Sequence, residues 1–473
     1  MKFNKSLIII LLLLIFCISF GAVSAADNAD MSVNDINNDD VATVENSVNV
    51  DGEISTVSEG IPYSSEIYDE IKSATGTYNI TGDYQIDITW EILNANVIIE
   101  GNNYTIYGNS KRAFNINGNN VIIKNLNFVD CRVEPGNSVV SSGGAICGAK
   151  SVSGCSFINC NASFGGAISS YGGSVSCCSF VGCSAGRGGA IFSDDGSVSG
   201  CSFINCNATD GGAVFSSKGS VSGCSFVGCS AGRGGAICGN VIDGGSVSGC
   251  SFINCNATDG GSIYSSGNLN INKNKFINSH ASSGGAIYFE GIGSVNYCIF
   301  DNNDASVAKA IFGSYDINYD FNFFSFKNDR DFPKHFIEKN KNSIIPNIWV
   351  VLEIITSGDS YFVNFVTDEG NNLSESMPDY TARLSINGVS KDILIKNNNY
   401  NDTFVPGNYV LNSLNSGNIL ANRTFNVPSD IPIGEGKDNG NGLSNSVGNM
   451  ENCGNPLIAL LIALICLSII RRK

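Results

Sequence analysis

Gly143-Gly144-Ala145-Ile146 is the first copy of a phrase that recurs, with small changes, through the middle of the chain. A second phrase, Ser-Val-Ser-Gly-Cys-Ser-Phe-Ile-Asn-Cys-Asn-Ala, separates the copies and is clearest over 151–162. Later copies of the first phrase begin at Gly165, Gly188, Gly211, Gly234, Gly260 and Gly284. A fixed period of about 23 residues indicates a stacked repeat architecture, in which one unit alone cannot bury its apolar face.

The composition of each unit favours strands over helices. Gly, Ser and Cys are poor helix formers, and the short β-type pieces are separated by Gly, Asn and Ser. We therefore predict an all-β fold in which residues 61–320 form a right-handed parallel β-helix of about ten coils, with three strands and three turns per coil. Equivalent residues would stack about 4.8 Å apart, so that columns of Val, Cys, Phe and Ile fill the interior.

The N-terminus has the features of an exported chain. Lys2 and Lys5 precede the apolar run 7–20, and the small residues 22–25 follow it, so residues 1–26 are predicted to be a secretory signal peptide. A retained membrane helix is the alternative, but the run is short for a span. Residues 27–60 contain nine acidic residues and no Lys or Arg, which predicts a disordered acidic leader. The net charge of −16 argues against a nucleic-acid partner.

The first coils are expected to be less regular than the repeats. The run Val97-Ile98-Ile99 is echoed by Val121-Ile122-Ile123, 24 residues later. Residues 68–72 are predicted to form a short capping helix ahead of these coils. Such a cap would shield the open end of the array from edge pairing.

Four further segments are predicted after the repeats. Rising charge over 321–345 indicates a terminal cap and linker, and strand-like runs with turn signals over 346–427 predict a small immunoglobulin-like β-sandwich. Residues 428–454 are rich in Gly, Asn and Ser and should be a flexible spacer. The apolar run within 455–473, followed by Arg471-Arg472-Lys473, predicts a C-terminal membrane anchor that leaves the bulk of the chain on the extracellular face of the membrane.

Taken together, these residues resemble a known family. The signal, the coils at 97–125, the Gly-Gly-Ala-Ile and Phe-x-x-Cys/Asn repeats, the closing segment Asn322-Phe323-Phe324 and the short C-terminal anchor resemble the adhesin-like surface proteins of methanogenic archaea. The repeats are also similar to those of chlamydial polymorphic outer-membrane proteins. The resemblance implies a pectin-lyase-like β-helix. Because this fold occurs in both enzymes and adhesins, the resemblance predicts the fold but does not distinguish between these functions.

The cysteines depart from the family pattern. Fifteen lie between Cys131 and Cys298, and the Asn that usually follows Phe-x-x is replaced by Cys at 160, 183, 206, 229 and 255. An Asn hydrogen-bond ladder would thus be replaced by a column of thiols. Buried reduced thiols behave as small apolar groups, which we favour, but disulfides between adjacent coils would also fit the geometry.

Residues with catalytic or metal-binding chemistry are sparse. The two histidines, His280 and His335, lie in different segments, which disfavours a histidine-rich metal site or a Ser-His-Asp triad. Asp194-Asp195 is the one adjacent acidic pair in the repeats and has no counterpart in neighbouring coils, so we interpret it as a loop pair. We predict no catalytic, cofactor or metal site and expect that the protein is not an enzyme.

The position after the conserved Ile is variable and often aromatic. It is expected to face outward, and its aromatic side chains could stack on sugars or meet a protein partner; scattered surface aromatics are the simpler interpretation, which we favour. The candidate binding residues are Phe192, Phe215, Tyr264 and Tyr288.

Two further sets of polar residues recur in the repeats. The residue before each Gly-Gly alternates in charge over Arg187, Asp210, Arg233 and Asp259, which predicts an exposed ladder of opposite charges without chemistry. Asn161, Asn207 and Asn256 begin Asn-x-Ser/Thr sequences, which accept glycans in hosts that modify exported chains.

Two functions from different classes are therefore predicted. The first is a membrane-anchored, adhesin-like or structural wall protein whose β-helix meets glycans or other cell-surface proteins. The alternative is a surface enzyme, a lyase or glycosidase, that degrades polysaccharide, and it requires clustered carboxylates on one face of the helix.

Overall fold

The computed structural model describes residues 60–134, 141–239, 245–313, 317–325, 336–338 and 348–425. The chain divides into two units, 1–58 and 59–473, and all of the described residues belong to the second. The predicted signal peptide, the acidic leader up to residue 59, the spacer and the anchor lie outside the described residues. Within the described part, no helix is both long and apolar enough to cross a membrane.

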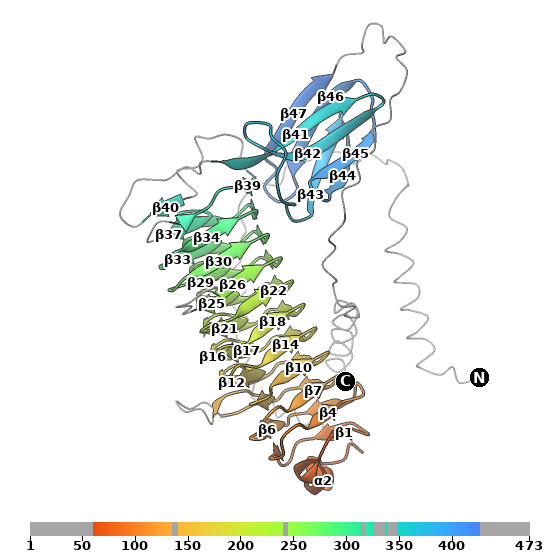
Figure 1. Ribbon diagram of the computed structural model, residues 1–473, viewed down its shortest axis with the longest axis vertical. Helices are drawn as coiled ribbons and strands as arrows, with labels where there is room; N and C mark the ends of the chain where they lie inside the picture. Colours follow the sequence, from red (N-terminus) through yellow and green to blue (C-terminus); the bar gives the residue numbers. More distant parts are fainter. Residues whose placement is uncertain are drawn as a thin grey trace, which may run out of the picture. The chain divides into compact units, whose positions relative to one another are not determined.

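The repeats form a parallel β-helix of the right-handed type, in which each strand pairs with its counterpart one coil away (Figure 1). Its sheets are named here by the residue that recurs in them. The valine sheet contains β1 (Thr77–Asn79), β4 (Ile98–Glu100), β7 (Ile122–Lys124), β10 (Ser151–Ser153), β14 (Ser174–Ser176), β18 (Ser197–Ser199), β22 (Ser220–Ser222), β26 (Gly245–Ser248), β30 (Leu269–Asn272), β34 (Gly293–Asn296) and β38 (Ile317–Asn318).

The phenylalanine sheet follows the valine sheet in each coil. It contains β2 (Tyr84–Gln85), β5 (Thr105–Tyr107), β8 (Asn127–Val129), β11 (Ser156–Ile158), β15 (Ser179–Val181), β19 (Ser202–Ile204), β23 (Ser225–Val227), β27 (Ser251–Ile253), β31 (Lys275–Ile277), β35 (Ile299–Asp301) and β39 (Asn322–Phe324). The isoleucine sheet closes each coil. It contains β3 (Trp90–Ile92), β6 (Phe114–Ile116), β9 (Ile146–Cys147), β13 (Ile168–Ser170), β17 (Ile191–Ser193), β21 (Val214–Ser216), β25 (Ile237–Gly239), β29 (Ile263–Ser265), β33 (Ile287–Phe289), β37 (Ile311–Gly313) and β40 (Phe336–Glu338).

The central coils have a fourth strand, so the prediction of three strands per coil is wrong there. This alanine sheet contains β12 (Asn161–Phe164), β16 (Ser184–Arg187), β20 (Asn207–Asp210), β24 (Ser230–Arg233), β28 (Asn256–Asp259), β32 (His280–Ser283) and β36 (Asp304–Val307). The segment before each Gly-Gly has too few large apolar residues to be recognised as a strand. Its backbone nevertheless pairs in register, as Ala162 does with Ala185.

The interior is filled by columns of identical side chains, as the repeat predicts. Phe157, Phe180, Phe203 and Phe226 are fully buried, and successive rings are stacked with centroids 4.8–4.9 Å apart. The register pairs like with like, for example Phe180 with Phe203. Truncating one ring should therefore expose a void between two neighbours, which is the origin of the cost of such substitutions.

Three turns in each central coil have a left-handed backbone, as at Cys177, Gly182 and Gly188 in one coil. One follows the phenylalanine strand and is occupied by Asn159 (φ 54°) in one coil and Gly182 (φ 63°) in the next. Asn and Gly are the residues that adopt this conformation most readily. Their recurrence at this position explains why the chain leaves each strand at the same point.

Most of the described cysteines lie inside the helix in two columns, whereas Cys147 and Cys238 lie on the outer side of the isoleucine sheet; fourteen described cysteines are free thiols. The first column contains Cys155, Cys178, Cys201, Cys224 and Cys250, and the second contains Cys131, Cys160, Cys183, Cys206, Cys229 and Cys255. In the first column the backbone N–H of Cys178 donates to Sγ of Cys201 at 3.5 Å, and that thiol donates to the carbonyl of Val175 at 3.7 Å. Burial raises the pKa of Cys201, so the thiol stays protonated and can donate.

The first coil is closed by the 3-10 turn η1 (Ser64–Ile67) and by helix α2 (Tyr68–Ser73), which confirms the predicted capping helix. Buried Ile71 of α2 belongs to the main core. The indole Nε1 of Trp90 donates to the carbonyl of Ser64 at 2.9 Å, and Trp90 is itself fully buried. The cap is thus tied to the first coil by an apolar contact and a buried hydrogen bond.

The coils continue past residue 320 and lead directly into an antiparallel sandwich. Strand β41 pairs in parallel with β39 and antiparallel with β42. One sheet of the sandwich contains β41 (Trp349–Ser357), β42 (Ser360–Thr367) and β45 (Asn399–Thr403). The other contains, in spatial order, β44 (Val389–Ile395), β43 (Tyr380–Ile386), β46 (Gly407–Ser413) and β47 (Ile419–Phe425).

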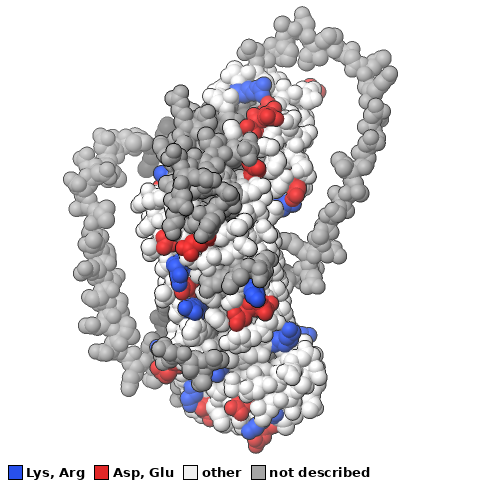
Figure 2. Space-filling model, turned by 60° about the vertical axis from the view of Figure 1, so that its left-hand side comes forward, with Lys and Arg blue, Asp and Glu red and all other residues white. Residues whose placement is uncertain are grey.

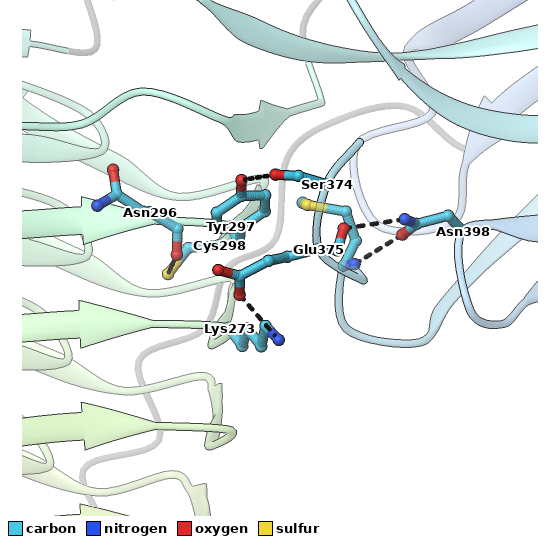
Figure 3. A network of polar contacts seen from close by, with 8 residues as sticks. Lys273, Asn296, Tyr297, Cys298, Ser374, Glu375 and Asn398 are labelled. Atoms are coloured by element: carbon cyan, nitrogen blue, oxygen red, sulfur yellow. Dashed lines mark hydrogen bonds and ion pairs between the residues drawn. The ribbon is translucent and has the colours of Figure 1, made fainter. Parts of the chain in front are cut away.

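Polar contacts join the sandwich to the last coils. Figure 3 shows Tyr297 beside Ser374, with 2.9 Å between their hydroxyls, and Lys273 paired with Glu375 at 3.0 Å. Asp301 is fully buried and accepts hydrogen bonds from the Ser413 hydroxyl at 2.7 Å and the Tyr380 hydroxyl at 3.0 Å. The sandwich therefore covers the final coil.

Candidate site at the glycine corner

Charged and aromatic side chains lie together on the outer surface where the alanine sheet turns into the isoleucine sheet. We call this region the glycine corner. The last residue of each alanine strand from β12 to β32 precedes a Gly-Gly pair, and the isoleucine strand follows; after β36 the pair is Ala308-Lys309. Gly188 has a φ of 62°, and a Cβ added to Gly189 would collide with the carbonyl of Gly212. The glycines thus permit a tight turn, which brings the charged column and the aromatic column side by side.

The charged column has the predicted register. Arg187 pairs with Asp210 across β16 and β20, and Asp210 pairs with Arg233 across β20 and β24. Arg233 binds Asp210 through two hydrogen bonds, Nε to Oδ1 at 2.8 Å and Nη2 to Oδ2 at 2.9 Å. Arg187 approaches the same carboxylate at 3.6 Å.

The expectation that every rung of this ladder is exposed is wrong for Asp210. Its side chain is 7 % exposed, against 49 % for Arg187 and 46 % for Arg233. The two arginines cover the shorter aspartate from both sides. The hydrogen bond with Asp210 raises the pKa of Arg233, so the guanidinium stays charged at any physiological pH.

The aromatic column lies outside the main core but is not an open stripe. Phe215 is 4 % exposed and Tyr264 5 %, and they enclose Cys238 in a separate small cluster. The Arg187 guanidinium lies over the Phe215 ring at 5.5 Å and that of Arg233 over the Tyr264 ring at 5.3 Å. The outward direction was predictable, but the burial of these two rings was not, because the arginines of the neighbouring strand cover them.

The two other candidate aromatics are more accessible. Phe192 and Tyr288 are half-buried and pack at the two ends of the cluster. Phe192 stacks on Phe215 with centroids 5.4 Å apart, and Tyr288 stacks on Tyr264 at 5.3 Å. Of the four proposed binding residues, these two therefore offer ring surface to a ligand.

Glu290 adds a carboxylate to this corner that sequence reasoning missed. It follows β33, and its charge acts on both Tyr264 and Asp259. Burial raises the pKa of Tyr264 to about 12, and Glu290 contributes to the rise. Burial also raises the pKa of Asp259 and Glu290 adds to the effect, while a hydrogen bond with Ser283 and the charge of Arg233 oppose it. The positions equivalent to Glu290 in other coils are turn residues. The repeat therefore does not predict which side chains lie near Glu290.

A groove runs along the outer face of the alanine sheet. It has a volume of about 530 Å³, and its lining includes Asn207, Ser230, Asn256, Thr258 and His280. Amides, hydroxyls and one imidazole are groups that hydrogen-bond neutral polar ligands. His280 Nδ1 lies 4.0 Å from Asp304, which is also paired with Lys309 at 2.9 Å.

The remaining sequence candidates are not assembled into a site. Asp194 and Asp195 lie in the bend between β17 and β18, as expected for a loop pair. His335 lies outside the described residues. Within the described ranges, no group of three or more His, Cys, Asp and Glu is placed to hold a metal ion.

The surface is sparsely charged. On the face drawn in Figure 2, the Lys, Arg, Asp and Glu side chains gather in a few mixed clusters, and most of the other described surface is uncharged. Comparison with known proteins finds no matching family model, curated protein or solved structure. Arguments about function therefore rest on the residues themselves.

Proposed function

We propose that this chain is an adhesin-like or structural protein of the cell surface, with glycans or other surface proteins as partners. The predicted signal peptide and the predicted C-terminal anchor support a location on the extracellular face of the membrane. The family resemblance supports the same assignment.

One observation carries the proposal: the same outward groups recur in register from coil to coil. Asn161, Ser184, Asn207, Ser230 and Asn256 form one outward column of the alanine sheet. An enzyme needs one unique arrangement of groups. A periodic surface instead suits a periodic polymer or a dense array of partners, because many weak contacts then act together.

We further propose that residues 346–427 form an immunoglobulin-like module. Seven antiparallel strands lie in two sheets, in the orders β41-β42-β45 and β44-β43-β46-β47. Near the start of β46, the Tyr409 hydroxyl donates to the carbonyl of Val405 at 2.7 Å. A tyrosine at the beginning of the sixth strand that bonds to backbone upstream is a hallmark of such sandwiches. This module would hold the β-helix away from the membrane.

Binding can be tested with the full chain in detergent on a glycan array and against intact cells. We expect retention that increases with the density of the immobilised ligand, because the repeated surface acts multivalently. Loss of binding after Tyr288→Ala together with Phe192→Ala would assign the contact to the glycine corner. Lys150→Ala, on another face, is the matched control. No binding to any cell surface or glycan would contradict the proposal.

The alternative, a polysaccharide-degrading enzyme, gains support from one observation. Burial raises the pKa of Asp259, and the charge of Glu290 adds to the rise. Glycosidases use two carboxyl groups, of which the general acid has a raised pKa. Release of reducing sugar from polysaccharide that is abolished by Asp259→Asn and by Glu290→Gln would establish the enzyme, and absence of release would exclude it.

A further inference from the structure

We propose that Asn207 and Asn256 are N-glycosylation sites, and that the groove on the alanine sheet receives the first sugar of each attached glycan. The inference rests on the proposed surface location, since the reaction occurs on exported chains. The groove would then hold the first sugars of the chain's own glycans, and these glycans would recur along the same outward column.

The first argument is the geometry of the two acceptor sequences. Asn207-Ala208-Thr209 and Asn256-Ala257-Thr258 each lie on one alanine strand. The asparagine and the threonine are exposed, and the alanine between them is 7 % exposed in both cases. The acceptor amide and the hydroxyl that the reaction requires therefore project from the same face of the strand.

The second argument is their spacing along the helix. The coil between them carries Ser230 and Gly232 at the corresponding positions. Successive coils are about 4.8 Å apart, so the two acceptor asparagines are separated by roughly twice that distance. A glycan on every coil would be crowded. Alternation with a serine and a glycine leaves open surface beside each acceptor.

The third argument is the groove itself, whose volume is about 530 Å³. It contains both acceptor asparagines, and Ser230, Thr258 and His280 in its lining offer hydrogen bonds to sugar hydroxyls. Asn207 Nδ2 donates to Oγ of Ser230 at 2.7 Å. After attachment, the remaining N–H can keep this bond, so the modification is compatible with the folded coil.

The reaction needs a host oligosaccharyltransferase and a lipid-phosphate-linked oligosaccharide as co-reactant. A bond forms between Nδ2 of the asparagine and the anomeric carbon of the first sugar. The bond from that carbon to the phosphate oxygen breaks, and the lipid phosphate leaves with the electron pair. The amide loses one proton, and no oxidation or reduction takes place.

The test uses the full chain, isolated from the cells that produce it, with surface exposure measured by protease shaving of intact cells. Mass spectrometry of peptides that contain Asn207 or Asn256 should show attached sugar. Asn207→Gln and Asn256→Gln should each remove the mass of one glycan. Thr209→Ala should remove the glycan while keeping the asparagine, Thr209→Ser should retain it, and Lys150→Ala, outside the groove, is the control that leaves glycan mass unchanged.

The outcomes separate this inference from the function on which it rests. A chain that is shaved from the surface but carries no sugar at either asparagine overturns the inference alone. A chain that is neither on the surface nor modified overturns both. A total glycan mass that is unchanged after both Asn→Gln substitutions would place the modification at other asparagines, such as Asn161, and would also overturn it.

Discussion

The coils of Cys155 to Cys255 and those of Asn274 to Asn322 hold the same backbone with different side chains. In the first set, which we call the thiol coils, Cys201 accepts from the N–H of Cys178 at 3.5 Å and donates to the carbonyl of Val175 at 3.7 Å. In the second set, the amide coils, Asn274 and Asn322 lie on either side of one remaining thiol, Cys298, and Asn274 takes the equivalent pair of partners. It accepts from the N–H of Cys250 at 2.8 Å and donates to the carbonyl of Val247 at 2.8 Å.

The difference shows that one interior position can be filled in two ways. An amide gives short, strong hydrogen bonds, but its removal leaves the buried backbone N–H and carbonyl without a hydrogen-bond partner. A thiol is a weak donor and acceptor that also packs as a small apolar group. The second column makes the same change, since Asn303 of the late coils donates to the carbonyl of Phe276 at 2.9 Å, whereas Cys183 does so to Phe157 at 3.8 Å.

The largest expected loss of stability comes from truncating a stacked phenylalanine, and it should be similar in both sets of coils. Phe203 lies among the thiol coils and Phe276 among the amide coils, and both are fully buried between stacked rings. Substitution of either by Ala should lower the free energy of unfolding by about 3–5 kcal/mol, measured by chemical denaturation. A loss below about 1 kcal/mol would show that the ring does not fill the interior. A large difference between the two sites would mean that the two sets of coils are packed to different densities.

The second prediction separates the two kinds of ladder. Asn274→Ala leaves a buried N–H and a buried carbonyl without their partner and should cost about 2–4 kcal/mol. The matched change Cys201→Ala removes a small apolar group with weak hydrogen bonds and should cost about 1–2 kcal/mol. Asn274→Cys should recover part of the loss. Equal costs for the two alanine variants would contradict the distinction between amide and thiol coils.

The coil register could be predicted from the sequence because identical residues mark each column. Phe157 and Phe180 recur at the repeat period, and the structure pairs them. The fourth strand could not be predicted, since the segment of Ala162 lacks the apolar alternation that marks a strand. The exchange of Asn for Cys after Phe-x-x could be predicted as a substitution of one ladder by another, and the hydrogen bond of Cys183 to Phe157 agrees with it.

The glycine corner was predictable only in part. Sequence position places Arg233 and Asp210 in one column, and the structure confirms this. The sequence does not specify the angle at which the Gly-Gly turn redirects the chain. That angle decides whether the Tyr264 ring is exposed to solvent or lies under Arg233. For the same reason the contribution of Glu290, which comes from a turn, could not be foreseen.

The charged column on the outer surface of the thiol coils should contribute less to stability than the buried columns. Arg233→Asp would place a carboxylate beside Asp210, whose side chain is only 7 % exposed. We expect a loss of about 1–3 kcal/mol, smaller than for the core changes because the arginines themselves reach solvent. Adding Asp210→Arg and Asp259→Arg restores alternation and should recover part of it. A single change that is neutral at low salt, or a triple variant less stable than the single one, would show that these residues do not act as a ladder.

The smallest expected effect concerns Asp259, the rung with a raised pKa. Because the folded state raises this pKa, folding favours the protonated carboxyl. Any benefit is complete below the pKa of the unfolded chain and is lost as the pH rises through the folded value, so the ionised Asp259 is slightly unfavourable at neutral pH. Asp259→Asn should therefore leave Tm unchanged in acid and raise it slightly at pH near 7, with Asp392→Asn as a control of opposite sign, since its hydrogen bond with Arg383 lowers the pKa of that carboxyl. A Tm difference between Asp259→Asn and the natural chain that does not change between acid and neutral pH would show that burial and Glu290 do not govern this rung.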